Sequence, residues 1–181
     1  MLGPKATPAL AFAAFSGTGK TTLIQKIVPL LRGRGMRLGL IKHCHHDFEI
    51  DTPGKDSYVL RQAGATKIVV ASRRRTVVIG DTLTGTGETL KIVLRRLEGR
   101  GLDLILVEGF KHARVAKIEL HRASLGYPLL YRNDNNVIAV ASDTALPDVP
   151  LPLLNLNDAA AIATFILSLI SSKNELSYRH R

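Results

Sequence analysis

The segment that most constrains the fold of this chain is a glycine-rich turn directly after an apolar run. Residues 10–15 are continuously apolar, which is typical of a central strand covered on both faces. Residues 14–21 then match the pattern G-x-x-x-x-G-K-[ST], except that Ala14 replaces the first glycine. From about Lys20 to Leu31, apolar residues recur at helical spacing. A strand, this turn and a helix in that order favour an α/β fold with a phosphate-binding loop.

The residue types in the turn explain how it would hold a phosphate. Gly17 and Gly19 can adopt positive φ at low cost, which lets the backbone curl around an anion. The amides of Thr18, Lys20 and Thr21 would point into the same nest. We expect Lys20 to bridge the β- and γ-phosphates and the Thr21 hydroxyl to ligate Mg²⁺. An ordinary glycine-rich turn is the alternative, and the flanking strand and helix make it the weaker one.

The remaining patterns predict alternating strands and helices. We expect a second strand at 37–42, an apolar strand at 102–107 and a buried strand at 137–141, and helices at about 52–63, 88–97 and 158–171. In the first of these helices, Thr52 would be the N-cap and Pro53 would lie in the first turn. The buried face of that helix would consist of Val59, Leu60 and Ala63.

Two further regions predict an antiparallel extension of the sheet. Residues 67–71 and 76–79 are β-branched runs typical of a hairpin, and residues 116–121 alternate like a half-solvated antiparallel strand. We therefore expect one domain over residues 1–181, with a three-layer, P-loop NTPase-like α/β fold and a mainly parallel sheet. The extension, at about 68–80 and 116–131, and the apolar C-terminal helix are both candidate dimer surfaces.

Composition restricts the class of protein. Of the 181 residues, 45% are hydrophobic and 22% are charged, as in soluble globular domains. The single cysteine, Cys44, excludes an internal disulfide and fits a reducing, cytoplasmic setting. The apolar stretch at 159–170 is shorter than the roughly 20 residues that span a bilayer. We therefore expect a cytoplasmic protein with no membrane partner.

The positive charge of the chain indicates anionic partners. Lys and Arg number 25 against 15 for Asp and Glu, which gives a net charge of +10. Such an excess suits nucleic acid, but the only dense basic run is at 73–75 and no stacking aromatics are interleaved with it. We therefore do not expect nucleic acid as a partner. Lys42, Lys55 and Lys111 fall near the expected ligand edge, which favours small phosphorylated ligands.

A second part of the phosphate site should come from an acid at the end of a neighbouring strand. Residues 104–107 are apolar and lead into Glu108, which we expect to contact Mg²⁺ or water. Asp103 is the alternative, but it precedes Glu108 by five residues at about 3.3 Å per residue, which places it at the far edge of the sheet. The alternative for Glu108 is a carboxylate that only ends a strand.

A histidine-rich segment follows the second strand and emerges at the expected ligand edge. His43, His45 and His46 lie within four residues and could bind a transition metal such as zinc or nickel. Alternatively, this segment and residues 53–56 respond to the nucleotide, with Lys55 near phosphate and Asp47 or Asp56 near Mg²⁺ or water.

Taken together, these motifs resemble one family. FSGTGKTT, GLIKHCHHD, DTPGKDSY, DLILVEGFKH and VIAVASD occur in this order and resemble the molybdopterin-guanine dinucleotide biosynthesis protein B (MobB) family from about residue 10 to residue 158. The resemblance implies a cytoplasmic, homodimeric GTP-binding protein with weak GTPase activity. In that family, the protein assists attachment of GMP to molybdopterin, and a separate partner protein is the guanylyltransferase.

The motifs and the resemblance together give the expected site residues, with GTP and Mg²⁺ as ligands. Lys20 and Glu108 would be catalytic in any hydrolysis, and Thr21, Glu108 and Asp47 would be metal ligands. The nucleotide-binding residues would be Ser16, Gly17, Thr18, Gly19, Lys20, Thr21, Thr22, Pro53, Gly54, Lys55, Asp56, Glu108 and Gly109.

Base recognition and the exact function remain open at this stage. The chain has no N-K-x-D motif, so Asp143 is our candidate acceptor for guanine, although it could simply cap a turn. Hydrolysis should be slow, because no residue clearly orients water or supplies an arginine. The competing hypothesis is a metallochaperone-like GTPase that uses His43, His45 and His46. Whether molybdopterin contacts this chain or only its partner also stays open.

Overall fold

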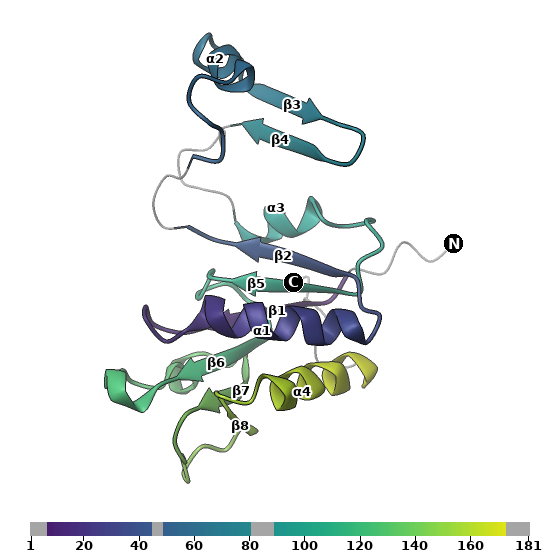
Figure 1. The fold of residues 1–181 in the computed structure, drawn as a ribbon. Coiled ribbons are helices and arrows are strands. Elements are labelled where there is room, and N and C mark those ends of the chain that lie inside the picture. The colour runs from purple at the N-terminus through teal and green to yellow at the C-terminus, as the bar shows by residue number, and fades with distance from the viewer. Residues whose placement is uncertain (1–6, 45–48, 81–88, 173–181) are drawn as a thin grey trace. The chain divides into compact units, whose positions relative to one another are not determined.

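The computed structural model describes residues 7–44, 49–80 and 89–172. The chain forms two compact units. The first consists of Met1–His43 and Leu90–Arg181, and the second is the insertion Cys44–Thr89. Figure 1 shows the strands and helices of both units, and each unit is described by itself below.

The first unit is built on a parallel sheet of six strands. Its strands are β1 (Ala9–Ala13), β2 (Leu38–Lys42), β5 (Leu104–Glu108), β6 (Lys117–His121), β7 (Val137–Ser142) and β8 (Leu153–Asn155). They lie in the order β2-β5-β1-β6-β7-β8, and every neighbouring pair is parallel. Strands β1 and β5 are buried along their whole length, as their continuous apolar runs predict.

Helices cover both faces of this sheet. On one face, α1 (Lys20–Gly33) and α4 (Ala159–Ser171) bury Ile27 and Ile162 in the same core as Phe12 of β1. On the other face, the short helix α3 (Leu90–Arg95) packs Leu90 and Leu94 into a second core with residues of β1 and β5. The predicted three-layer α/β fold is therefore confirmed (Figure 1).

The prediction for residues 116–121 is wrong in its direction and its exposure. Strand β6 is parallel to both β1 and β7, lies inside the sheet, and is buried from Lys117 to Leu120. Lys117 and Glu119 alternate with apolar residues, as in a half-solvated strand, but residues 126–136 pack over the face on which they lie. Residues 116–131 are therefore not part of an antiparallel extension.

Specific partners compensate the two buried charges of β6. Lys117 Nζ lies 2.8 Å from Asp134 Oδ2. Glu119 accepts hydrogen bonds from the backbone amides of Leu130 and Tyr131, at the start of the 3₁₀ helix η2 (Leu130–Asn133). Burial outweighs these two bonds and raises the pKa of Glu119. Long-range polar pairing therefore allows a polar strand face to lie in the interior.

The second unit contains helix α2 (Asp56–Gln62) and an antiparallel hairpin of β3 (Lys67–Ala71) and β4 (Thr76–Gly80). The predicted hairpin at residues 68–80 is confirmed, but it forms a separate two-stranded sheet and does not extend the parallel sheet, so that part of the prediction is wrong. The predicted start of the helix is wrong, because Thr52 lies in a turn in which its carbonyl accepts from the Lys55 amide, and α2 begins four residues later.

The predicted buried face of this helix is also wrong. Val59 and Leu60 are 55% and 58% exposed, and Ala63 follows the end of α2 as an exposed residue. The physical reason is the size of the unit: a two-turn helix beside a two-stranded hairpin has too little surface to bury an apolar face. No helix within the described residues is long and apolar enough to cross a membrane.

Candidate functional site

The loop between β1 and α1 has the conformation that phosphate binding requires. Gly17 and Gly19 have φ of +78° and +98°, in the region that favours glycine. The buried Thr18 fixes the loop from inside, because its hydroxyl donates to the Phe15 carbonyl at 2.9 Å. The Phe15 ring stacks on Tyr127, with 4.4 Å between ring centroids. Contacts within the protein therefore hold the loop in its curled conformation.

Lys20 is folded back across this loop. Its Nζ donates to the carbonyls of Ala14 and Phe15, at 3.0 Å each. Burial lowers the pKa of Lys20, nearby Glu108 opposes that shift, and the positive charge of Lys111 adds to it. An ammonium group that is partly removed from water, and that rests on neutral carbonyls, is well suited to bind phosphate oxygens.

Glu108 reaches the same loop from the neighbouring strand. It ends β5 opposite Phe12 of β1, and its Oε1 accepts from the Thr21 hydroxyl at 2.5 Å. Its Oε2 lies 3.9 Å from Lys42 Nζ. The structure thus brings together Thr21 and Glu108, the two predicted Mg²⁺ ligands that lie in the described residues. A hydroxyl and a carboxylate are the hard oxygen donors that Mg²⁺ prefers, so these side chains fit the ion.

Asp103, the alternative acid, lies at the opposite end of β5. It pairs there with Arg37, whose Nε is 3.4 Å from its Oδ2. The hydrogen bonds from the backbone and side chain of Arg37 lower the pKa of Asp103. Asp103 therefore belongs to the edge of the sheet remote from the loop.

The residues after β5 and β2 pack closely together. Gly109 has φ of +97°, and a Cβ atom on it would lie 2.8 Å from His43 Cβ. The His43 amide donates to the Glu108 carbonyl at 2.9 Å, and its ring lies 4.3 Å from the Phe110 ring. His43 therefore contributes to the packing that positions Glu108.

Several predicted site residues cannot be placed beside the phosphate loop. Asp47, His45 and His46 lie outside the described residues, so the predicted metal cluster stays a prediction. Among the described residues, no group of three His, Cys, Asp or Glu side chains is arranged to hold a metal. The predicted segment Pro53, Gly54, Lys55 and Asp56 belongs to the second unit and leads into α2, so its role in nucleotide binding also stays a prediction.

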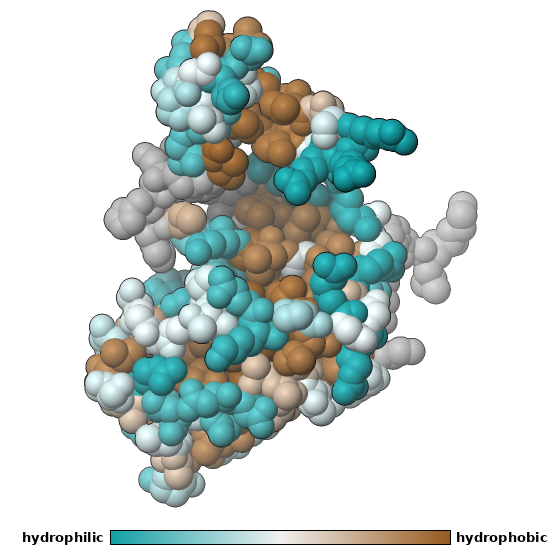
Figure 2. All heavy atoms as spheres, in the orientation of Figure 1, coloured by the Kyte–Doolittle hydropathy of each residue, from teal (hydrophilic) through white to brown (hydrophobic). Residues whose placement is uncertain are grey.

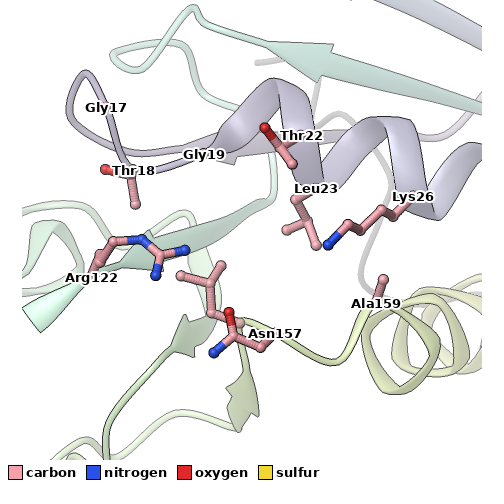
Figure 3. A pocket seen from close by; sticks show the side chains of 10 residues that line it. Gly17, Thr18, Gly19, Thr22, Leu23, Lys26, Arg122, Asn157 and Ala159 are labelled. Carbon is pink, nitrogen blue, oxygen red and sulfur yellow. The ribbon is translucent and has the colours of Figure 1, made fainter.

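A hollow of about 150 Å³ adjoins the phosphate loop on the side of β6. The loop, the adjacent helix starts and the ends of two strands line it: Gly17, Thr18, Gly19, Thr22, Leu23, Lys26, Arg122, Leu156, Asn157 and Ala159 (Figure 3). Its loop residues and Thr22 are among the predicted site residues, whereas Arg122 and Asn157 are not. Arg122 directly follows strand β6, and this position could have identified it as a site residue. That strand was instead predicted to belong to an antiparallel extension of the sheet.

Asp143, the predicted acceptor for guanine, follows β7 and is engaged by the protein itself. Its Oδ1 accepts from the Ala123 amide at 2.9 Å, and its Oδ2 lies 3.3 Å from Arg122 Nη1. Its side chain is only 17% exposed. Guanine would therefore compete with two existing partners for this carboxylate.

The region that contains the phosphate loop matches a known protein family. The family model for molybdopterin guanine dinucleotide synthesis protein B (MobB) matches residues 9–143, which include the loop, Glu108 and Asp143. The chain belongs to the MobB family. The matched region includes the insertion as well as most of the parallel sheet, so the assignment covers both units.

Relatives cover this MobB-family chain almost completely. A molybdopterin-guanine dinucleotide biosynthesis adapter protein of Escherichia coli K12 is 47% identical over 175 residues, which are 96% of this chain and 99% of that protein. A protein of the same name from Haemophilus influenzae is 37% identical over 88% of this chain and 87% of its own length. The crystal structure of Bacillus subtilis MobB aligns with a TM-score of 0.72 at 25% identity, over 95% of this chain and 99% of that one.

Proposed function

We propose that this MobB-family chain is a GTP-binding adapter protein of molybdopterin guanine dinucleotide biosynthesis, which assists a separate guanylyltransferase. The observation that carries the proposal is the hydrogen bond of 2.5 Å from the Thr21 hydroxyl to Glu108 Oε1, directly after a glycine loop with two positive φ angles. The adapter names of the E. coli and H. influenzae relatives, and their coverage of the chain, support the biosynthetic role.

Nucleotide binding would use groups that are already in position. The loop amides and Lys20 would hold the β- and γ-phosphates, with the Lys20 ammonium exchanging the carbonyls of Ala14 and Phe15 for phosphate oxygens. Thr21 and Glu108 would hold Mg²⁺, which supplies positive charge against the phosphates when bound. We expect Thr22, at the start of α1, to donate its amide to the α-phosphate side of the nucleotide.

Hydrolysis by the isolated chain should be weak. The clamp around Lys20 and Glu108 stabilises charge on the phosphates, and such electrostatic stabilisation supports phosphoryl transfer. Rapid hydrolysis also needs a residue that orients the attacking water, which the contacts around Glu108 do not supply, since this carboxylate is held by Thr21 and Lys42. An adapter that responds to bound GTP, with slow turnover, fits this arrangement better than a robust enzyme.

The site assignment is tested by Lys20→Ala. A hydrogen bond to a charged group contributes about 1.5–3 kcal/mol, so we expect a loss of roughly 10- to 150-fold in affinity for GTP with Mg²⁺, measured by isothermal titration calorimetry. Lys91→Ala is the matched control, because Lys91 is an exposed lysine on α3. Unchanged GTP affinity in Lys20→Ala would overturn the assignment.

We further propose that the chain is a cytoplasmic homodimer that uses the hairpin of the second unit. Val69 pairs with Val78 on one face of the hairpin, and Val70 with Val77 on the other, so both faces are apolar. These four valines are exposed, and Figure 2 shows brown side chains over β3 and β4. An isolated two-stranded sheet is marginal in water, and covering it with a second copy would stabilise it.

Sedimentation velocity tests the proposed dimer. Val78→Asp places a charge on the apolar face of the hairpin, and we expect it to shift the protein toward monomer. Arg74→Asp, in the turn between β3 and β4, is the control for charge alone. A dimer that persists unchanged in Val78→Asp would exclude this surface.

A further inference from the structure

The hollow beside the phosphate loop shares Gly17, Thr18, Gly19 and Thr22 with the proposed phosphate site, but the residues on its other side have no role there. It lies on the β6 side of β1, whereas Glu108 approaches the loop from β5 on the opposite side. Ligands of open α/β sheets bind at the carboxyl ends of the strands, and Arg122 and Asn157 follow the ends of β6 and β8. The hollow is therefore placed to receive the part of a ligand that extends beyond the phosphate loop.

Two basic side chains, Lys26 and Arg122, line the hollow, and Arg122 is the one that packs beside the loop. Its Nη2 lies 4.0 Å from the position that a Cβ atom on Gly19 would take, so the guanidinium packs beside the loop backbone. The side chain is 34% exposed, which leaves part of it open to a ligand. Figure 3 shows it extending between the phosphate loop and Asn157.

Asp143 holds Arg122 in this position. One carboxylate oxygen accepts from the Ala123 amide and the other faces Arg122 Nη1, so the carboxylate is fixed at both oxygens. A flexible arginine side chain anchored in this way loses less conformational freedom when it contacts a ligand. Asp143 can thus act by holding Arg122 in place, without contacting the base directly.

We propose that Arg122 contacts the nucleoside of the bound nucleotide, and that Asp143 is the residue that positions Arg122; this inference rests on the proposed nucleotide binding. The guanidinium is planar and weakly hydrated, and it stacks on aromatic rings such as a purine base. The buried side chains of Leu23 and Leu156 line the same hollow and provide an apolar wall for a ring. The phosphates remain with Lys20 and Thr21.

Comparing two ligands tests the proposal. The affinities of the full chain for GTP and for inorganic tripolyphosphate, each with Mg²⁺, are measured by calorimetry. We expect Arg122→Ala to weaken GTP binding about tenfold, which is about 1.4 kcal/mol, and to change tripolyphosphate binding by less than twofold. Arg132→Ala, an exposed arginine on η2, is the matched control and should change neither affinity.

Asp143→Asn tests the positioning role. We expect it to weaken GTP binding by a smaller factor than Arg122→Ala and to leave tripolyphosphate binding unchanged. The double variant should bind GTP no more weakly than Arg122→Ala alone, because Asp143 acts through Arg122. Arg122→Met, which retains the aliphatic part of the side chain, replaces Arg122→Ala if that variant does not fold. An additive loss in the double variant would overturn the positioning role.

The possible outcomes separate this inference from the proposed function. If wild-type protein binds neither ligand, nucleotide binding and this inference fail together. If wild-type protein binds GTP and Arg122→Ala binds it equally well, only this inference fails. Equal losses for GTP and tripolyphosphate would make Arg122 a phosphate ligand, which also overturns the proposal. Full GTP affinity in Arg122→Lys would also overturn the proposal, because lysine keeps the charge but has no planar face to stack on a base.

Discussion

The buried ion pair between Lys117 and Asp134 should dominate the stability of the sheet around β6. Lys117 is fully buried, its Nζ lies 2.8 Å from Asp134 Oδ2, and it also donates to the Ala113 carbonyl at 2.5 Å. The substitution Lys117→Met keeps most of the aliphatic volume and removes the charge. It therefore isolates the electrostatic contribution of the pair.

The structure sets the expected size of the effect. Removing one partner of a buried ion pair costs about 3–5 kcal/mol, because the other charge stays behind without compensation. Here Asp134 Oδ1 still accepts from the Asn136 amide at 2.9 Å and from the Asn136 side chain at 2.7 Å. The Asp134 side chain is also 22% exposed. We therefore expect a loss near the lower end, about 3 kcal/mol in the free energy of unfolding.

The effect on Asp134 can be followed separately. Burial favours a raised pKa for Asp134, but the bonds from Lys117 and Asn136 outweigh it and lower the pKa. In Lys117→Met the pKa of Asp134 should rise, because the largest opposing interaction is gone. Adding Asp134→Asn removes the uncompensated carboxylate, so the double variant should recover part of the lost stability.

Urea unfolding followed by far-ultraviolet circular dichroism measures these changes, since the chain has no tryptophan for fluorescence. A loss of about 3 kcal/mol corresponds to a decrease of roughly 6–12 °C in Tm for a chain of this size. Lys91→Met, on the exposed side of α3, is the control. A loss below about 1 kcal/mol in Lys117→Met, or simple additivity in the double variant, would refute the reasoning.

Two further predictions concern a buried carboxylate and a glycine. Because burial raises the pKa of Glu119, the folded protein binds this proton more tightly than the unfolded chain does. The stability contributed by Glu119 is thus full below its unfolded pKa of about 4.3 and is lost as the pH rises through its folded pKa. The stability of wild type relative to Glu119→Gln should accordingly fall as the pH rises above the unfolded pKa in urea titrations, and a pH-independent difference would contradict this. Gly109→Ala should lower stability more than Gly126→Ala in thermal melts, because both positions have positive φ but only the new Cβ at Gly109 would lie 2.8 Å from His43. Equal losses would show that the close approach to His43 has no cost.

Local patterns predicted the part of the fold that forms the proposed phosphate site. The apolar run before Gly17, the glycines of the loop and the spacing after Lys20 are all contained in one short segment. The position of Glu108 followed from strand geometry, since parallel strands end at a common edge, and the structure places it against Thr21. These features depend on nearest neighbours in sequence or on a general rule of parallel sheets.

The wrong prediction for β6 shows that a local sequence pattern carries no information about distant polar partners. Alternation of Lys117 and Glu119 with apolar residues normally indicates a face in water. Here their partners, Asp134 and the amides of η2, lie more than ten residues further along the chain. Because β6 was assigned to an antiparallel extension, Arg122 at its end was not recognised as part of the ligand edge.

The order of the strands has a consequence for the synthesis of the protein. Strand β1 leaves the ribosome first, but both of its sheet partners, β5 and β6, come from residues beyond 100. The backbone N–H and C=O groups of this apolar strand therefore stay without their sheet partners until β5 and β6 have been translated, and closing contacts of such long sequence separation is slow. The phosphate loop, although encoded within the first 21 residues, should acquire its anion-binding shape only late in folding. A nascent chain that ends before β5 would therefore expose an unpaired, aggregation-prone strand and would lack the proposed nucleotide site.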